Sequence, residues 1–252
     1  MPTSPISRRV READLYDVIA GRQRGQSDVP IYLAMAALNP GPVLELGTGT
    51  GRVLIPLIHA GLNAIGLEND LGRIQAGLTN LMDQVGTRAS SRLVHGDMTE
   101  WRAPATFSLI IAPFNVLSLL DDGALNATLD SCRINLLAGG QLVFEAQCWP
   151  REDDPAEEWQ FGPTEVEVGP HAAIYSEGVR REGRAVRVQR RFTFRDGSFR
   201  ETSSLLHVRS RGAWARVLED QGWELTDQIL DERGGLASAR SKLLYVRATP
   251  RS

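Results

Sequence analysis

Short apolar runs alternate with amphipathic stretches through the middle of the chain, between residues 43 and 147. An uninterrupted apolar run is typical of a buried strand, whereas apolar residues at three- and four-residue steps are typical of a helix. The pattern predicts strands at Val43–Leu46, Asn63–Glu68, Arg92–His95, Phe107–Ala112 and Gln141–Gln147. It predicts helices at Val53–Ile58, Leu71–Val85 and Asp121–Leu137, the last of them stopped by Ala138-Gly-Gly140.

The segments on either side have other patterns. Two short helices are expected before the first strand, at Ala13–Ala20 and Val29–Leu38. After residue 150, apolar and polar positions alternate in the runs 165–168, 173–177, 184–194 and 198–208, which predicts an antiparallel sheet. Arg195-Asp-Gly-Ser198 is a hairpin turn signal within it. A last helix is expected at 212–223, and a closing hairpin from 223–230 and 241–248.

These patterns divide the chain into four parts. We expect an N-terminal helical arm at 1–42, an α/β core at 43–150, an inserted antiparallel sheet at 151–210, and a final helix with a closing hairpin at 211–252. At 252 residues, one large domain with an insertion is the natural size class.

Three glycines at alternate positions, Gly47, Gly49 and Gly51, follow the first predicted strand. Glycine permits positive φ and lets a ligand approach where a Cβ would block it. The amide groups that open the next helix favour a carboxylate or another anion. Strand, turn and helix together therefore predict a ligand site.

A carboxylate ends the second predicted strand at Glu68, about 20 residues downstream, where such a group accepts both hydroxyls of a ribose. A nicotinamide-dependent oxidoreductase would share this arrangement. Its fingerprint is G-x-G-x-x-G, whereas the glycines here read G-x-G-x-G and Arg52 stands where the third glycine belongs. The spacing speaks against a dinucleotide.

Leu44-Glu-Leu-Gly-Thr-Gly-Thr-Gly51, followed by Gly66-Leu-Glu68, resembles the first two motifs of class I S-adenosylmethionine-dependent methyltransferases. Gly96-Asp-Met98 and Ala112-Pro-Phe-Asn115 stand where that family has its next two, and the resemblance covers about residues 13–148. Tyr16-Asp17 resembles the segment that closes over the cofactor in small-molecule N-methyltransferases of the glycine and aminosugar type. The resemblance implies an α/β, Rossmann-like fold: a seven-stranded, mostly parallel sheet with helices on both faces, and an inserted antiparallel β-sheet lid.

The resemblance also implies the site. Glu68 would hold the ribose, Asp97 the adenine amino group, and Met98 the adenine ring. The carbonyl of Ala112 or Pro113 would accept the cofactor ammonium, and Arg22 or Arg24 would pair with its carboxylate. The expected cofactor-binding residues are Tyr16, Arg22, Arg24, Glu45, Gly47, Thr48, Gly49, Gly51, Arg52, Glu68, Asn69, Asp97, Met98, Ala112, Pro113 and Phe114, and the expected catalytic residues are Tyr16 and Asn115.

The implied chemistry is in-line displacement of the methyl group, with S-adenosylhomocysteine as product and no metal. Nitrogen is slightly favoured over oxygen as acceptor, because an amine needs only to be the free base whereas a hydroxyl wants a general base. His171, Tyr175 and His207 are candidate bases, and Arg191 or Arg209 is a candidate partner for an acidic substrate. Nucleic-acid amino methyltransferases carry Asp/Asn-Pro-Pro-aromatic where this chain has Ala-Pro-Phe-Asn, which argues against a base amino group.

Composition narrows the partners. A formal net charge of −3 offers no general attraction to nucleic acid, and the arginines of the predicted insertion are interspersed with acidic residues. No apolar run approaches the roughly 20 residues of a membrane span, and the N-terminus lacks a signal-peptide core. We expect a cytoplasmic monomer or homodimer acting on a small molecule. A nicotinamide-dependent oxidoreductase, an RNA or protein methyltransferase and a non-catalytic cofactor-binding module remain as alternatives.

Overall fold

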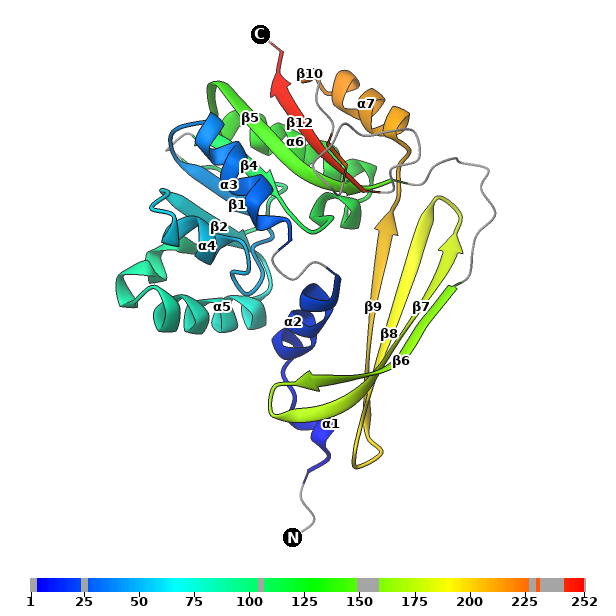
Figure 1. The fold of residues 1–252 in the computed structure, drawn as a ribbon. Helices are drawn as coiled ribbons and strands as arrows, with labels where there is room; N and C mark the ends of the chain where they lie inside the picture. The colour runs from blue at the N-terminus through cyan, green and yellow to red at the C-terminus, as the bar shows by residue number, and fades with distance from the viewer. Residues whose placement is uncertain are drawn as a thin grey trace.

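The computed structural model of the chain describes residues 4–23, 27–103, 107–148, 159–226, 230–231 and 243–251. A large sheet between two layers of helices forms one lobe, and a four-stranded antiparallel sheet forms a second (Figure 1). The N-terminal helices lie beside the second sheet on the side of the large one (Figure 1). The predicted fold class is therefore confirmed.

The large sheet has the strand order β10-β12-β5-β4-β1-β2-β3, with β11 (Leu230–Asp231) paired to β12 off this path. Strands β1 to β5 pair in parallel, whereas β12 runs antiparallel to both β5 and β10. The carboxyl ends of the parallel strands therefore meet at one edge, where ligands bind in open α/β sheets. The strands span Val43–Leu46 (β1), Ala64–Glu68 (β2), Leu93–His95 (β3), Phe107–Ala112 (β4), Leu136–Gln147 (β5), Trp223–Leu225 (β10) and Leu243–Pro250 (β12).

Helices cover both faces of this sheet. One apolar cluster joins it to α3, α4 and α5, and a second joins it to α6 and α7. The helices span Val29–Leu38 (α3), Leu54–His59 (α4), Leu71–Gln84 (α5), Asp122–Asn135 (α6) and Arg211–Asp220 (α7), with short 3₁₀ turns at Thr87–Arg92 (η1) and Val116–Leu119 (η2). Among the described residues, no helix is both long enough and apolar enough to cross a membrane.

The predicted glycine stop of α6 is wrong. The helix ends at Asn135 and Leu136 is already extended, pairing with Phe107 of β4. Leu136 is buried in the same apolar cluster as Phe107, and this packing ends the helix before the glycines. Ala138, Gly139 and Gly140 instead lie inside β5, where the register with β4 is irregular.

The second sheet, which we call the lid sheet, has the order β6-β7-β8-β9 and is inserted between β5 and α7. Its strands span Trp159–Val168, His171–Glu182, Ala185–Phe194 and Phe199–His207. The predicted turn at residues 195–198 joins β8 to β9, and the Phe194 N–H donates to the Ser198 carbonyl at 2.8 Å. Helices α1 (Ile6–Arg9) and α2 (Glu12–Gln23) form the arm, and α2 packs Leu15 and Ile19 against the face of the sheet that carries Tyr175 and Phe192. We call this the arm-facing face.

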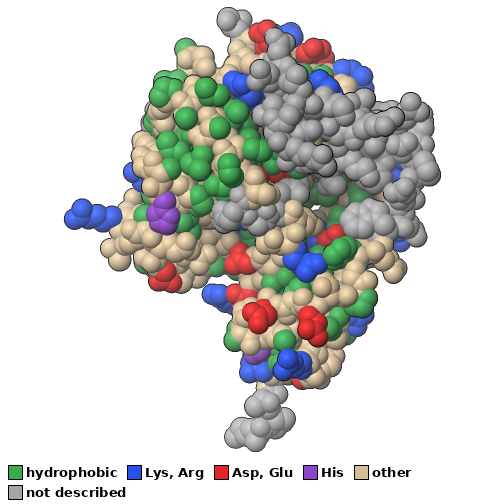
Figure 2. Space-filling view, viewed as in Figure 1, with side chains coloured by type: hydrophobic (Ala, Val, Ile, Leu, Met, Phe, Trp, Pro, Cys, Tyr) green, Lys and Arg blue, Asp and Glu red, His purple; other side chains and the backbone are tan. Residues whose placement is uncertain are grey.

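Charged side chains on the lid sheet are paired. Arg187 bonds Glu182 at 2.8 Å, Arg190 bonds Glu177 at 2.8 Å, and Arg191 lies 3.6 Å from Glu201. Figure 2 shows acidic and basic side chains interspersed over the lower lobe, which holds the arm and the lid sheet. Mixed, paired charge is typical of a solvated sheet surface.

Candidate active site

The glycine loop after β1 lies at the carboxyl edge of the large sheet. Gly47 and Gly49 have φ of +63° and +59°, in the left-handed region that favours glycine. A Cβ on Gly47 would stand 2.5 Å from Cγ2 of Val116, with Met98 on its other side at 3.8 Å. A Cβ on Gly49 would stand 2.9 Å from the ring of Tyr16. The loop is thus a cradle between η2, Met98 and the arm, with no room for larger residues.

Glu68 holds its carboxylate beside this loop. One oxygen accepts the Gly49 N–H at 2.8 Å, and the other accepts the N–H groups of Asn69 and Asp70 at 3.1 and 3.0 Å. The side chain is buried at the end of β2. Three backbone donors therefore fix the carboxylate where a ribose is expected.

Asp97 follows β3 and is exposed. Its Oδ1 accepts the N–H and the hydroxyl of Thr99 at 2.8 and 2.7 Å, and these hydrogen bonds lower the pKa of the carboxyl group. Its Oδ2 accepts no hydrogen bond from any residue that the structure describes. An ionised carboxylate with one open oxygen suits a ligand amino group.

The turn after β4 is strained. Ala112 and Pro113 are buried, and Phe114 and Asn115 both have left-handed φ, 56° and 57°. Two consecutive non-glycine residues in this region are uncommon, and such strain clusters at functional sites. Asn115 is buried, and its Oδ1 has no hydrogen-bond partner among the described residues. An orphaned buried acceptor costs about 1–3 kcal/mol, so the position fits a ligand that donates to it.

The arm closes the glycine loop from the other side. Tyr16 packs edge-on against Phe114, with ring centroids 6.1 Å apart, and the Arg73 guanidinium lies 4.8 Å from its ring. Asp17 accepts the hydroxyl of Thr50 at 2.6 Å. Burial raises the pKa of Tyr16 to about 12, so the phenol stays protonated at neutral pH. Tyr16 therefore shapes the site without acting as a base.

The predicted arginines separate. Arg52 bonds the buried carboxylate of Asp28 through both guanidinium nitrogens, at 2.5 and 2.7 Å. Arg22 lies against the lid sheet, 5.1 Å from the Phe161 ring and 5.2 Å from the Tyr175 ring. Arg24 falls outside the described residues. The sequence did not single out Asp28, Arg73 or Val116, because each acts here through a partner distant in the chain.

Glu45 is buried under the glycine loop. Its Oε2 accepts the Thr48 hydroxyl at 2.9 Å. Burial raises the pKa of the carboxyl group to about 8, against the smaller opposing effects of the Thr48 hydrogen bond and the Arg52 charge. The folded protein therefore keeps this proton over a range in which the unfolded chain has lost it.

This difference predicts a pH-dependent stability. Because the folded pKa of about 8 lies above the ordinary value of 4.5, the contribution is complete below 4.5 and is lost as the pH rises through 8. The loss is as much as about 1.4 kcal/mol per pH unit. Glu45→Gln keeps an acceptor for Thr48 and has no proton to lose. Urea unfolding from pH 5 to 8 should show a flatter profile for the variant, and parallel profiles would contradict the assignment.

A glycine loop after β1, a carboxylate ending β2 and an Asp-Met pair after β3, on this strand order, define the class I methyltransferase fold with an S-adenosylmethionine site. Residues 43–140 match the family model described as a methyltransferase domain. The chain is a class I S-adenosylmethionine-dependent methyltransferase. No curated protein matches it significantly.

Solved structures share the fold over nearly the whole chain. The CcbJ methyltransferase from Streptomyces caelestis is 20% identical with a TM-score of 0.77, and 90% of each chain is covered. CalS10 from Micromonospora echinaspora, an amino pentose methyltransferase solved with bound S-adenosylmethionine, is 21% identical with a TM-score of 0.68, covering 93% of this chain and 96% of that one. The glycopeptide N-methyltransferase MtfA in complex with S-adenosylmethionine is 20% identical with a TM-score of 0.63, covering 90% and 94%.

Proposed function

We propose that this enzyme transfers the methyl group of S-adenosylmethionine to a nitrogen of a small-molecule acceptor, by in-line displacement that releases S-adenosylhomocysteine. The observation that carries the proposal is the orphaned Oδ1 of buried Asn115, at the carboxyl end of β4 beside Phe114. A carbonyl oxygen accepts a hydrogen bond from an amine N–H and leaves the nitrogen lone pair free to attack. The names of MtfA and CalS10, an N-methyltransferase and an amino pentose methyltransferase, agree with an amine acceptor.

The cofactor supplies an activated methyl carbon, so the protein mainly positions the reactants and excludes water. We assign the ribose to Glu68, the adenine to Asp97 and Met98, and the amino-acid end to the glycine loop and the carbonyls of Ala112 and Pro113. Tyr16 covers the sulfonium end, since an aromatic ring stabilises a neighbouring cation. Arg52 is committed to Asp28, and we give it a structural role.

Nitrogen is favoured over oxygen because the candidate bases lie elsewhere or are mismatched. Tyr16 has its pKa raised to about 12, and Glu45 is enclosed beneath Thr48. His171 and His207 lie at opposite ends of the lid sheet, at the start of β7 and the end of β9. A hydroxyl acceptor needs such a base in reach, whereas an unprotonated amine does not.

The test uses S-adenosylmethionine with matched primary amines and alcohols, scoring S-adenosylhomocysteine release and the mass gain of the acceptor. Amines should gain a methyl group and the alcohols should not. Asn115→Ala should lower kcat/KM for amines about 10- to 100-fold, the cost of one lost hydrogen bond, and leave the affinity for S-adenosylhomocysteine unchanged. Asn115→Asp keeps an acceptor oxygen at a backbone conformation that Asp tolerates, and serves as the control. Methylation of the alcohols alone, or cofactor binding without turnover of any amine, would contradict the proposal.

A further inference from the structure

Arg22 stands in the last turn of α2 with its guanidinium between two rings of the arm-facing face. The distances to the centroids of Phe161 and Tyr175 are 5.1 and 5.2 Å. Aromatic faces hold a guanidinium in place but leave its N–H groups, which lie at its edge, free to donate. Within the described part of the chain, Arg22 has no carboxylate partner. It is also exposed, so its charge is accessible to a ligand.

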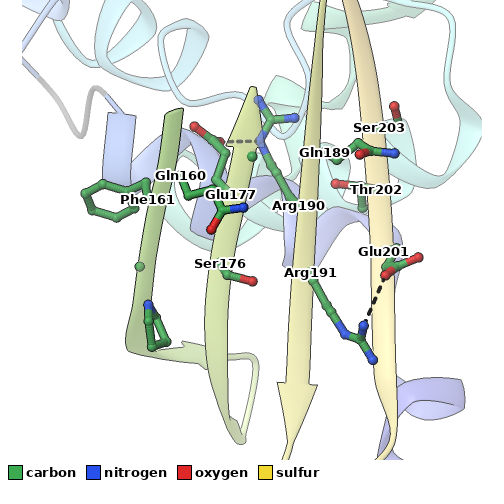
Figure 3. A pocket seen from close by; sticks show the side chains of 13 residues that line it. Gln160, Phe161, Ser176, Glu177, Gln189, Arg190, Arg191, Glu201, Thr202 and Ser203 are labelled. Atoms are coloured by element: carbon green, nitrogen blue, oxygen red, sulfur yellow. Dashed lines mark hydrogen bonds and ion pairs between the residues drawn. The ribbon is translucent and has the colours of Figure 1, made fainter. Parts of the chain in front are cut away.

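A buried polar network continues from Arg22 across the sheet. Tyr175, whose ring contacts Arg22, donates its hydroxyl to Glu177 at 2.7 Å. Arg190 donates to the same carboxylate oxygen at 2.8 Å and to the Ser204 hydroxyl at 3.2 Å. Figure 3 shows Glu177 and Arg190 joined across neighbouring strands. One carboxylate thus stands among two guanidinium groups, which leaves the cluster with one net positive charge, on Arg22.

The other arginines considered for an acidic substrate are already paired. Arg191 lies 3.6 Å from Glu201 and stacks on Phe199 at 3.9 Å, and Arg209 bonds Asp122 at 2.6 Å. Arg191 and Glu201 also line a groove of about 450 Å³ that crosses the four strands (Figure 3). They alternate with Glu177 and Arg190 along their strands, which places their side chains on the opposite face of the sheet. Arg22 alone joins an uncompensated charge to the arm-facing face.

Arg22 also lies within reach of the proposed reaction centre. It stands six positions after Tyr16 on α2, a rise of about 9 Å along the helix. Phe114, at the proposed methyl position, packs against the apolar cluster that contains Tyr175. A small molecule extending from Asn115 along this face would therefore bring its far end to Arg22.

We infer that Arg22 binds an anionic group of the acceptor, a carboxylate or a phosphate ester, and does not bind the carboxylate of the cofactor. Arginine matches both anions with paired hydrogen bonds. The inference rests on the proposed function, because it concerns the molecule that is methylated. It makes the substrate an amine that carries its negative charge roughly 9 Å from the nitrogen.

The experiment titrates the full chain, saturated with S-adenosylhomocysteine, with three amines of matched length: 6-aminohexanol, 6-aminohexanoate and 6-aminohexyl phosphate. One anionic compound should bind about tenfold more tightly than the alcohol, a difference of about 1.4 kcal/mol. Which of the two binds more tightly identifies the anion. Arg22→Gln should bring the ratio to about one without changing S-adenosylhomocysteine affinity, and Arg22→Lys should retain part of it. Arg88→Gln, at an exposed arginine of η1, controls for net charge.

Two results would overturn the inference. Equal affinity of the wild-type complex for the three compounds removes the anion site, and weaker binding of S-adenosylhomocysteine to Arg22→Gln gives Arg22 to the cofactor. Methyl transfer is assayed separately with the same compounds. Transfer to all three with equal KM leaves the proposed function standing and the inference refuted. An Arg22-dependent preference for the anion without methylation of any amine refutes the proposed function and leaves the anion site.

Discussion

Replacing Arg52 by methionine should lower the free energy of unfolding by about 3–5 kcal/mol. The guanidinium meets both carboxylate oxygens of Asp28, whose side chain is fully buried. Removal of the arginine leaves an uncompensated charge with nowhere to be solvated, which costs far more than the loss of an exposed ion pair. Asp28 precedes α3 and Arg52 precedes α4, so the pair also fixes the end of the arm to the glycine loop.

Urea unfolding measures this effect, and two further variants bracket it. In Arg52→Met/Asp28→Asn the buried charge is gone, so the double variant should recover part of the loss. Arg11→Gln breaks the Arg11–Asp14 pair, whose arginine is two-thirds exposed, and should cost roughly 1 kcal/mol at most. If Arg52→Met were as stable as Arg11→Gln, the pair would have no structural role.

Gly47→Ala should be the most damaging single methyl group in the cofactor site. The new Cβ would stand 2.5 Å from Cγ2 of Val116 at a residue with φ of +63°. The left-handed backbone costs about 1–2 kcal/mol and the overpacking about 1–3 kcal/mol more. Because η2 and Met98 must move apart to relieve the clash, calorimetry should show S-adenosylhomocysteine affinity reduced more than about tenfold, or 1.4 kcal/mol.

Gly61→Ala separates backbone strain from the loss of space. Gly61 has φ of +79°, but nothing lies within 4 Å of the position of its Cβ. This variant should show the strain cost alone and bind S-adenosylhomocysteine with wild-type affinity. The double variant Gly47→Ala/Val116→Ala should regain part of the lost affinity. Equal effects of the two alanines would show that the contact with Val116 has no bearing on cofactor binding.

The fold was predictable from the sequence where burial is uniform. Every residue of β1 and β4 is buried, so each strand is an unbroken apolar run whatever its neighbours. The end of α6 was not predictable, because local glycine preference competed with the burial of Leu136 against Phe107. Such a contact between strands depends on the folded arrangement, and short-range pattern does not contain it.

The cofactor site was predictable in its backbone and less so in its side-chain contacts. Gly47, Gly49 and Glu68 meet in one place because turn chemistry and strand order are local properties of a parallel sheet. The partner of Arg52 is 24 residues away and that of Arg22 lies on the lid sheet, so tertiary packing determines both. Adjacent motif and arm arginines therefore gave no sequence signal for their separate partners.

Helix α2 links the two halves of the proposed mechanism. Tyr16 and Asp17 contact the glycine loop at Gly49 and Thr50, while Arg22 and Gln23 contact Tyr175 and Glu177 of the lid sheet. One short helix thus touches both the expected cofactor and the expected acceptor. This arrangement would bring the reactants together and exclude water, which is the main task left to the protein when the cofactor supplies the activated carbon.

The central claim is that the carboxyl edge of the large sheet binds S-adenosylmethionine through Glu68 and Asp97. Calorimetric titration of the purified chain with S-adenosylhomocysteine and, in parallel, with NADH tests it most directly, repeated on Glu68→Ala and Asp97→Ala. The account predicts binding of S-adenosylhomocysteine alone, with a Kd on the order of micromolar, weakened by both substitutions. Binding of NADH alone, or S-adenosylhomocysteine affinity untouched by either substitution, would contradict it.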